Sequence, residues 1–240
     1  MSDLFDPEVL LSTVGRLEEG GVHLWVIYRV GSHSRTNDEA RLLSEHERYR
    51  AQRFRSDRDR NLFVSGRYYT RILLAGYAGI SPEQVTIGTD AFGKPFSDVG
   101  LHFSISHSRD LLLLGFSDTS IGVDIEQKDP LTAIERIGKN HFAEAEVQQL
   151  MIDEEAGRLD TFFNTWTKKE SVIKGIGRGL HISLQGVNVA NRDGCVRWEI
   201  PDGPSYGSWY VRGVETNPGY ASAYATQNPA SKLRTFHVEY

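Results

Sequence analysis

The chain has 240 residues and a formal net charge of −5, and its 39% hydrophobic and 25% charged content is ordinary for a globular protein with a sizeable core. The acidic balance argues against nucleic acid as a partner, and the single cysteine, Cys195, excludes an intramolecular disulfide and a cysteine-rich metal cluster. No apolar run approaches ~20 residues and no signal-peptide pattern opens the chain, so we expect a cytoplasmic protein with no membrane partner.

The N-terminal part of the chain predicts one strand and two helices. Apolar residues alternate through residues 22–30, which is a strand pattern with two bulky faces. Ser44 and Glu47 have the spacing of a capping box and predict a helix that runs to about residue 54. A second helix is expected over residues 57–77.

Eight arginines within and between these two helices form a basic cluster that is dense for an acidic protein. The simpler interpretation is a solvated helix face paired with nearby acidic residues. The alternative is that two or three of them bind phosphate, for which the guanidinium fork is well shaped. The cluster consists of Arg48, Arg50, Arg53, Arg55, Arg58, Arg60, Arg67 and Arg71.

A turn and two strands are expected next. The sequence Phe92-Gly-Lys-Pro95 is typical of a turn. Alternating apolar residues from Leu101 to Ile105 predict a strand that carries Ser106 and His107 near its end. The continuous apolar run over residues 111–116 predicts a buried strand, which should pair with the strand that begins at residue 121.

Residues 121–126, Ile-Gly-Val-Asp-Ile-Glu, predict a strand with two carboxylates on one face. Val123 and Ile125 would face a core, while Asp124 and Glu126 share the opposite face because residues two apart on a strand point the same way. Water, protonation of one carboxylate or a bridging cation would relieve the repulsion. Of these three, only a bridging cation would make the strand a metal-binding site. By itself, the pattern is more typical of an ordinary half-exposed strand.

Residues 162–180 predict an amphipathic helix with further charged side chains. Its apolar residues recur at helical spacing, and three glycines follow at its end. Lys169, Glu170 and Lys174 lie on the flank of the apolar stripe. Alone, Glu170 and Lys174 are an ordinary pair one turn apart, but beside the carboxylates of residues 121–126 they predict a metal and phosphate site.

The remaining segments predict two short helices and five strands. The helices are expected over residues 130–138 and 144–151. The strands should flank the strand at residues 121–126, and no proline-, glycine- or serine-rich linker interrupts the chain. They are expected at residues 187–190, 195–200, 208–214, 220–226 and 233–238.

Four motifs in this order resemble those of one enzyme family. The stretches Gly122–Glu126 and Trp166–Lys174 resemble the two signature motifs of the 4′-phosphopantetheinyl transferases, specifically the surfactin-synthetase-activating (Sfp) type. The residues at 92–95 and 103–108 look like the family's two further landmarks upstream. The resemblance implies an α+β fold, a pseudo-dimer of two similar halves, each a small antiparallel sheet packed against a long helix. The halves would be residues 1–119 and 120–240, with coenzyme A in the cleft between them.

The resemblance also implies the chemistry of the site. Asp124, Glu126 and Glu170 would hold Mg²⁺, which prefers carboxylate oxygens and substrate phosphates. Lys174 would stabilise or protonate the leaving group, and Lys169 would assist it. Glu170 or a metal-held water would take the proton from the attacking hydroxyl, which makes Asp124, Glu170 and Lys174 the candidate catalytic residues. Glu146, in the family's Phe-x-x-x-Glu position, is expected near the metal or its water shell.

For coenzyme A, the resemblance implies contacts from both halves. The expected binding residues are Arg53 and Arg60 for the 3′-phosphate, Lys94 and Pro95 for the adenine, and Ser106, His107, Lys169 and Lys174. The sequence departs from the family at two places in this region. Glu47 stands where the Sfp type has lysine, and Leu62 stands where relatives often have arginine.

The implied activity is that of a holo-[acyl-carrier-protein] synthase. It would transfer 4′-phosphopantetheine from coenzyme A to a serine of an acyl, peptidyl or polyketide carrier protein, releasing 3′,5′-ADP. The carrier is expected to dock at residues 128–150, and the enzyme is expected to be a monomer. Two alternatives remain, another Mg²⁺-dependent phosphate enzyme and a non-catalytic coenzyme A-binding protein.

Overall fold

The computed structural model describes residues 10–11, 13–28, 39–179, 183–189, 194–199, 205–228 and 232–239, which form an α+β fold. The chain divides into two compact units. Unit 1 comprises Met1–Thr89, Pro95–Asp118 and Lys232–Tyr240, and unit 2 comprises Asp90–Lys94 and Thr119–Ser231. The expected division into residues 1–119 and 120–240 would place the strand at residues 232–238 in the second half, whereas this strand lies in unit 1. None of the described helices has the length and apolarity needed to cross a bilayer.

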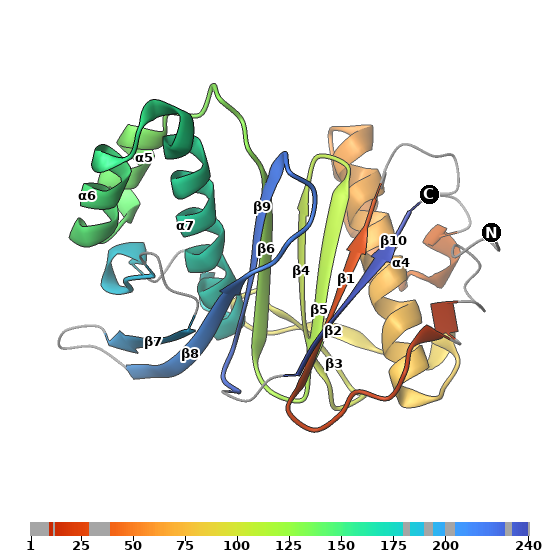
Figure 1. The fold of residues 1–240 in the computed structure, drawn as a ribbon. Helices are drawn as coiled ribbons and strands as arrows, with labels where there is room; N and C mark the ends of the chain where they lie inside the picture. Colours follow the sequence, from red (N-terminus) through yellow and green to blue (C-terminus); the bar gives the residue numbers. More distant parts are fainter. Residues whose placement is uncertain are drawn as a thin grey trace. The chain divides into compact units, whose positions relative to one another are not determined.

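Unit 1 contains a four-stranded sheet, a two-stranded sheet and one long helix (Figure 1). Both predicted helices are confirmed, and the capping box of Ser44 and Glu47 opens the first one. The helices are α3 (Glu45–Gln52) and α4 (Asp57–Ala78), with 3-10 turns η1 (Ala40–Leu42) and η2 (Pro82–Gln84). The strands are β1 (Gly21–Ile27), β2 (Ile87–Thr89), β3 (Pro95–Ser97), β4 (His102–Ser108), β5 (Leu111–Ser117) and β10 (Lys232–Val238).

The large sheet of unit 1 has the strand order β10-β1-β5-β4. Two expectations are wrong here. The sheet is mixed rather than antiparallel, because β10 returns from the C-terminus and pairs in parallel with β1. The apolar strand β5 pairs with β1 on one side and β4 on the other, so the expected pairing with the strand at residue 121 is not formed. Residues of α4 such as Tyr69 and Leu73 pack with Phe103 and Leu114 of the sheet in one apolar core.

The described residues of unit 2 form a four-stranded antiparallel sheet in the order β6-β9-β8-β7 and three helices. The strand predicted at residues 187–190 is not formed, because residues 187–189 lack strand structure and Ala190 lies outside the described residues. Val30 and Ile200, the last residues of two other predicted strands, also lie outside the described residues. The strands are β6 (Ile121–Gln127), β7 (Gly194–Glu199), β8 (Ser205–Gly213) and β9 (Tyr220–Thr226). The helices are α5 (Ile134–His141), α6 (Glu144–Ile152) and α7 (Glu155–Ile176), with the 3-10 turn η4 (Leu184–Gly186).

The two units share a strand-helix-strand-strand topology. In unit 1, β1, α4, β4 and β5 follow one another and give the strand order β1-β5-β4. In unit 2, β6, α7, β8 and β9 give the corresponding order β6-β9-β8. Both long helices span 22 residues and end at a glycine in the left-handed conformation, Gly79 and Gly177. The common topology supports a repeated plan, while the pseudo-dimer remains a prediction.

Candidate active site

The contact between α7 and β6 is as close as two backbones allow. A Cβ atom on Gly122 of β6 would lie 1.9 Å from the Ser171 carbonyl oxygen and 2.3 Å from the Gly175 backbone nitrogen. A Cβ on Gly175 would in turn lie 2.4 Å from the Trp209 ring. Only glycine fits at these positions, and α7 therefore lies directly on the face of β6 that carries the two carboxylates.

Asp124 and Glu126 are neighbours on this face of β6. Asp124 is buried, with 2% of its surface exposed, and Glu126 is half-buried. Their partners across the β6–β9 ladder are Ala223 and Ala221, whose small side chains leave space beside the carboxylates. Lys174, in the last turn of α7, donates a hydrogen bond from Nζ to Asp124 Oδ1 over 2.6 Å. The structure thus brings two of the predicted catalytic side chains into direct contact.

Glu170 completes the acidic group from one turn earlier on α7. Burial raises the pKa of its carboxyl, and the charges of Asp124 and Glu126 raise it further, while Lys174 lowers it. The one ammonium of Lys174 lies among three carboxylates, so the group carries excess negative charge when all three are ionised. The donor set, three carboxylates with a need for positive charge, fits a hard divalent cation such as Mg²⁺. No preformed cluster of three metal-binding side chains occurs among the described residues.

Lys169 and Glu146 form a buried ion pair with each other, and the coenzyme A contact expected for Lys169 and the metal contact expected for Glu146 stay predictions. Both side chains are 0% exposed, and Lys169 Nζ lies 2.5 Å from Glu146 Oε2. The ammonium also donates to the Val187 carbonyl, and Glu146 Oε1 accepts from the Val189 backbone N–H over 2.6 Å. Burial lowers the pKa of Lys169. The pair joins α6, α7 and the segment after η4.

Lys94 binds the end of α7. Its ammonium donates to the carbonyl of Gly175, one of the carbonyls in the last turn of the helix, and burial lowers its pKa. The helix dipole favours a cation here. Lys94, which lies in the turn predicted at residues 92–95, therefore anchors its segment to the helix that carries Glu170 and Lys174, a role that no local sequence signal indicates. Pro95, the next residue, begins β3 of unit 1.

The remaining predicted coenzyme A residues lie in unit 1. Ser106 is buried and His107 exposed on adjacent positions of β4. Arg53 follows the last residue of α3, with its guanidinium over the ring of Tyr49. Arg60 pairs with Asp57 over 3.0 Å at the start of α4. Neither arginine lines a described cavity. For both, the structure favours the interpretation as solvated side chains on a helix surface over that as phosphate ligands.

Glu47 lies at the base of a small cavity in unit 1 and is surrounded by two other arginines of the cluster. Its carboxylate pairs with Arg71 over 3.0 Å and with Arg67 over 3.6 Å. Arg67 has only 10% of its side chain exposed, its Nη1 has no hydrogen-bond partner in the structure, and burial lowers its pKa. The cavity, of about 90 Å³, is lined by Ser44, His46, Glu47, Arg50, Phe63, Arg67 and Ile87 to Thr89. No sequence pattern distinguishes Arg67 from the other arginines of the cluster. The acidic residue at position 47 is the one sequence feature that points to this cavity.

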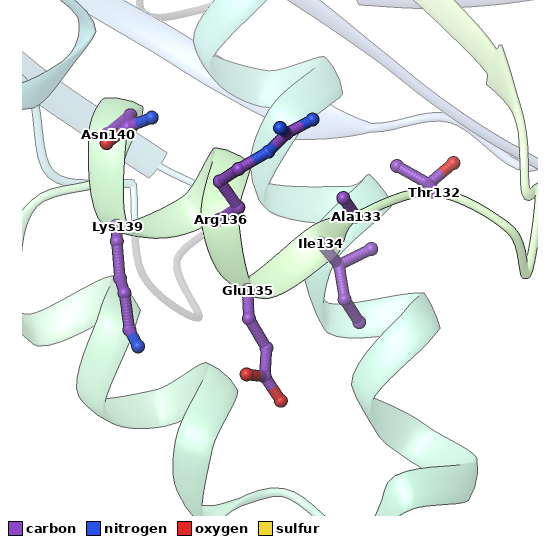
Figure 2. Close-up of a pocket in the computed structure, with 7 residues that line it drawn as sticks. All are labelled: Thr132, Ala133, Ile134, Glu135, Arg136, Lys139 and Asn140. Carbon is purple, nitrogen blue, oxygen red and sulfur yellow. The ribbon is translucent and has the colours of Figure 1, made fainter.

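The surface around α5 carries a second, open hollow (Figure 2). Arg136 projects to one side of the helix, and Glu135 and Lys139 project to the other. Leu131, just before the helix, is 91% exposed. Glu135 pairs with Arg158 of α7 over 3.5 Å. The hollow is lined by Thr132, Ala133, Ile134, Glu135, Arg136, Lys139 and Asn140.

Comparison with known proteins gives two matching family models and several curated relatives. Residues 120–225 match the 4′-phosphopantetheinyl transferase superfamily, and residues 32–117 match the N-terminal part of a 4′-phosphopantetheinyl transferase. The chain is 30% identical to 4′-phosphopantetheinyl transferase Sfp of Bacillus subtilis, over 78% of this chain and 83% of the relative. It is 35% identical to 4′-phosphopantetheinyl transferase HetI of a Nostoc species, over 70% and 73%. The chain belongs to the 4′-phosphopantetheinyl transferase family.

In this transferase the superfamily match covers the segment that holds β6, α7 and most of β9, and with them the carboxylates and Lys174. The N-terminal match covers α3, α4 and the cavity beside Glu47. One relative carries the name of a dehydrogenase. At 31% identity, covering 62% of this chain and 54% of the relative, it is the L-aminoadipate-semialdehyde dehydrogenase-phosphopantetheinyl transferase of Xenopus laevis.

Proposed function

We propose that this transferase moves the 4′-phosphopantetheine group of coenzyme A onto a serine hydroxyl of a carrier protein and releases 3′,5′-ADP. The observation that carries the proposal is the ion pair of Lys174 and Asp124 beside Glu126 and Glu170 on the α7–β6 contact. An acidic group with a partly exposed lysine is suited to a metal-bound diphosphate. We further propose that the chain acts as a cytoplasmic monomer.

Asp124, Glu126 and Glu170 would hold Mg²⁺, which would supply neutralisation of the diphosphate charge as the bond to the leaving group breaks. Lys174, half-buried at the end of α7, would contact the diphosphate and protonate or stabilise the departing oxygen. Glu170 is the candidate base for the serine hydroxyl. A metal-held water is the alternative base.

For the 3′-phosphate we propose the cavity beside Glu47 in place of Arg53 and Arg60. Arg67 is buried there with Nη1 unpaired, and Arg50 lines the same space. A bidentate guanidinium is well shaped for a phosphate monoester. Lys94, Pro95, Ser106 and His107 remain proposed coenzyme A contacts, with Lys94 acting through the anchored turn at residues 90–94.

The acceptor surface is proposed at α5. Arg136 and Lys139 are exposed there, and Leu131 adds an exposed apolar group (Figure 2). Carrier proteins are generally acidic around the modified serine, so a basic and apolar surface is complementary to them. Acyl, peptidyl and polyketide carriers all remain candidates, as does specificity as a holo-[acyl-carrier-protein] synthase.

The decisive experiment is intact-mass spectrometry of apo carrier proteins incubated with this protein, coenzyme A and Mg²⁺. We expect a mass gain of one phosphopantetheine that EDTA abolishes and that the Asp124→Ala variant cannot produce while remaining folded. Release of 3′,5′-ADP only when a carrier is present would separate this activity from phosphate hydrolysis. Coenzyme A binding without any mass gain across all carrier classes would contradict the proposal and favour a non-catalytic binding protein.

A further inference from the structure

The ion pair of Lys174 and Asp124 lies where a metal would bind. Asp124 has 3% of its side chain exposed, and Lys174 Nζ is 2.6 Å from its Oδ1. The carboxylate cannot rotate freely into solvent, because α7 lies directly on β6 at Gly122. A cation that uses Asp124 must therefore approach the same oxygen region that the ammonium already contacts.

A divalent ion and an ammonium repel each other strongly at such separations, and burial weakens the screening by water. Asp124 is fixed, whereas Lys174 has 32% of its side chain exposed and a flexible four-carbon stem. Lys174 is thus the partner that moves. Once it leaves Asp124, the ammonium loses that anion, and a substrate diphosphate at the end of α7 would replace it.

We propose that Lys174 occupies the metal position on Asp124 in the free enzyme and transfers to the substrate diphosphate, so that metal and coenzyme A bind cooperatively. This inference rests on the metal assignment of the proposed function. It makes the lysine a competitor of the metal before substrate binds and a partner of the substrate afterwards. The free enzyme would bind the metal weakly, and each ligand would strengthen the binding of the other to the same extent.

The test is the affinity for Mn²⁺, measured by electron paramagnetic resonance without and with coenzyme A and with no carrier protein. Without coenzyme A, Lys174→Met should bind Mn²⁺ about tenfold more tightly than the unchanged protein, because one neighbouring charge shifts such equilibria by about one to three logarithmic units. Lys174→Gln should behave alike, and Lys174→Arg should resemble the unchanged protein. Coenzyme A should tighten Mn²⁺ binding in the unchanged protein and much less in Lys174→Met.

Two control variants define the site. Lys232→Met removes one exposed positive charge from β10 of unit 1 and should leave Mn²⁺ affinity unchanged. Asp124→Asn should abolish the binding in every background. The inference is wrong if folded Lys174→Met and Lys174→Gln bind Mn²⁺ no more tightly than the unchanged protein, while the unchanged protein binds Mn²⁺ in the presence of coenzyme A. That result leaves the metal assignment standing. No Mn²⁺ binding by the unchanged protein under either condition overturns the metal assignment as well.

Discussion

Replacing Gly122 with alanine tests whether the backbone contact between α7 and β6 sets the geometry of the site. The new Cβ would lie 1.9 Å from the Ser171 oxygen, and real Cβ contacts essentially never fall below 3.0 Å, so the two elements must separate by at least 1.1 Å. That displacement carries Lys174 and Glu170 away from Asp124. A misplacement of about 1 Å can cost roughly a hundredfold in rate, and overpacking typically costs about 1–3 kcal/mol of stability.

The assay is the initial rate of phosphopantetheine transfer, together with Tm. We expect Gly122→Ala to lose about a hundredfold in kcat/KM, with Tm lower by several degrees. The matched control is Gly157→Ala on the same helix, where an added Cβ meets nothing within 4 Å. This control should keep full activity and gain up to about 1 kcal/mol from helix propensity. A Gly122→Ala protein with unchanged rate and Tm would refute the close-contact argument.

Three further predictions concern buried charges. Lys169→Met should destabilise the fold by about 3–5 kcal/mol, because it leaves the buried Glu146 carboxylate without its ion-pair partner. The double variant Lys169→Met, Glu146→Leu should recover much of that loss, as measured by urea unfolding. Arg67→Leu should raise KM for coenzyme A by about tenfold or more but leave KM for 3′-dephospho-coenzyme A unchanged, and an equal effect on both substrates would exclude a 3′-phosphate contact. Burial lowers the pKa of His23 to about 4, so stability should fall as pH drops from about 6.5 through 4, because the unfolded chain binds the proton first. Between pH 7 and 4, the free energy of unfolding of His23→Phe should fall by roughly 2 kcal/mol less than that of the unchanged protein. Parallel profiles of unfolding free energy against pH for the two proteins would exclude His23 as the cause.

His23 also shows what distinguishes the two units. It follows Gly21 and Val22 on β1 as Asp124 follows Gly122 and Val123 on β6, and its Nδ1 lies 2.8 Å from the Tyr77 hydroxyl at the end of α4. The corresponding strand position thus contacts the last turn of the long helix in both units. In unit 1 the contact is neutral and shares an aromatic environment with Phe236, whereas in unit 2 it is ionic.

Local sequence predicts several of the elements, and the family motifs predict the candidate catalytic residues. Hydrophobic periodicity and caps predict α3, α4 and β9 nearly to the residue, because these patterns reflect interactions between residues close in the chain. The motifs likewise indicate that Asp124, Glu170 and Lys174 act together. Strand alternation alone places Asp124 and Glu126 on one face, because the side-chain period of a strand is two residues.

The sequence predicts which residues carry the chemistry, whereas packing between distant segments decides which of their charged groups are exposed. Spacing on α7 cannot distinguish Lys169 from Lys174, since both lie beside the apolar stripe. Contacts from other parts of the chain make the difference: Glu146 and the carbonyl of Val187 enclose Lys169, whereas Lys174 stays partly exposed over Asp124. The same holds for β10, whose parallel pairing with β1 joins segments from opposite ends of the chain and leaves no local signal.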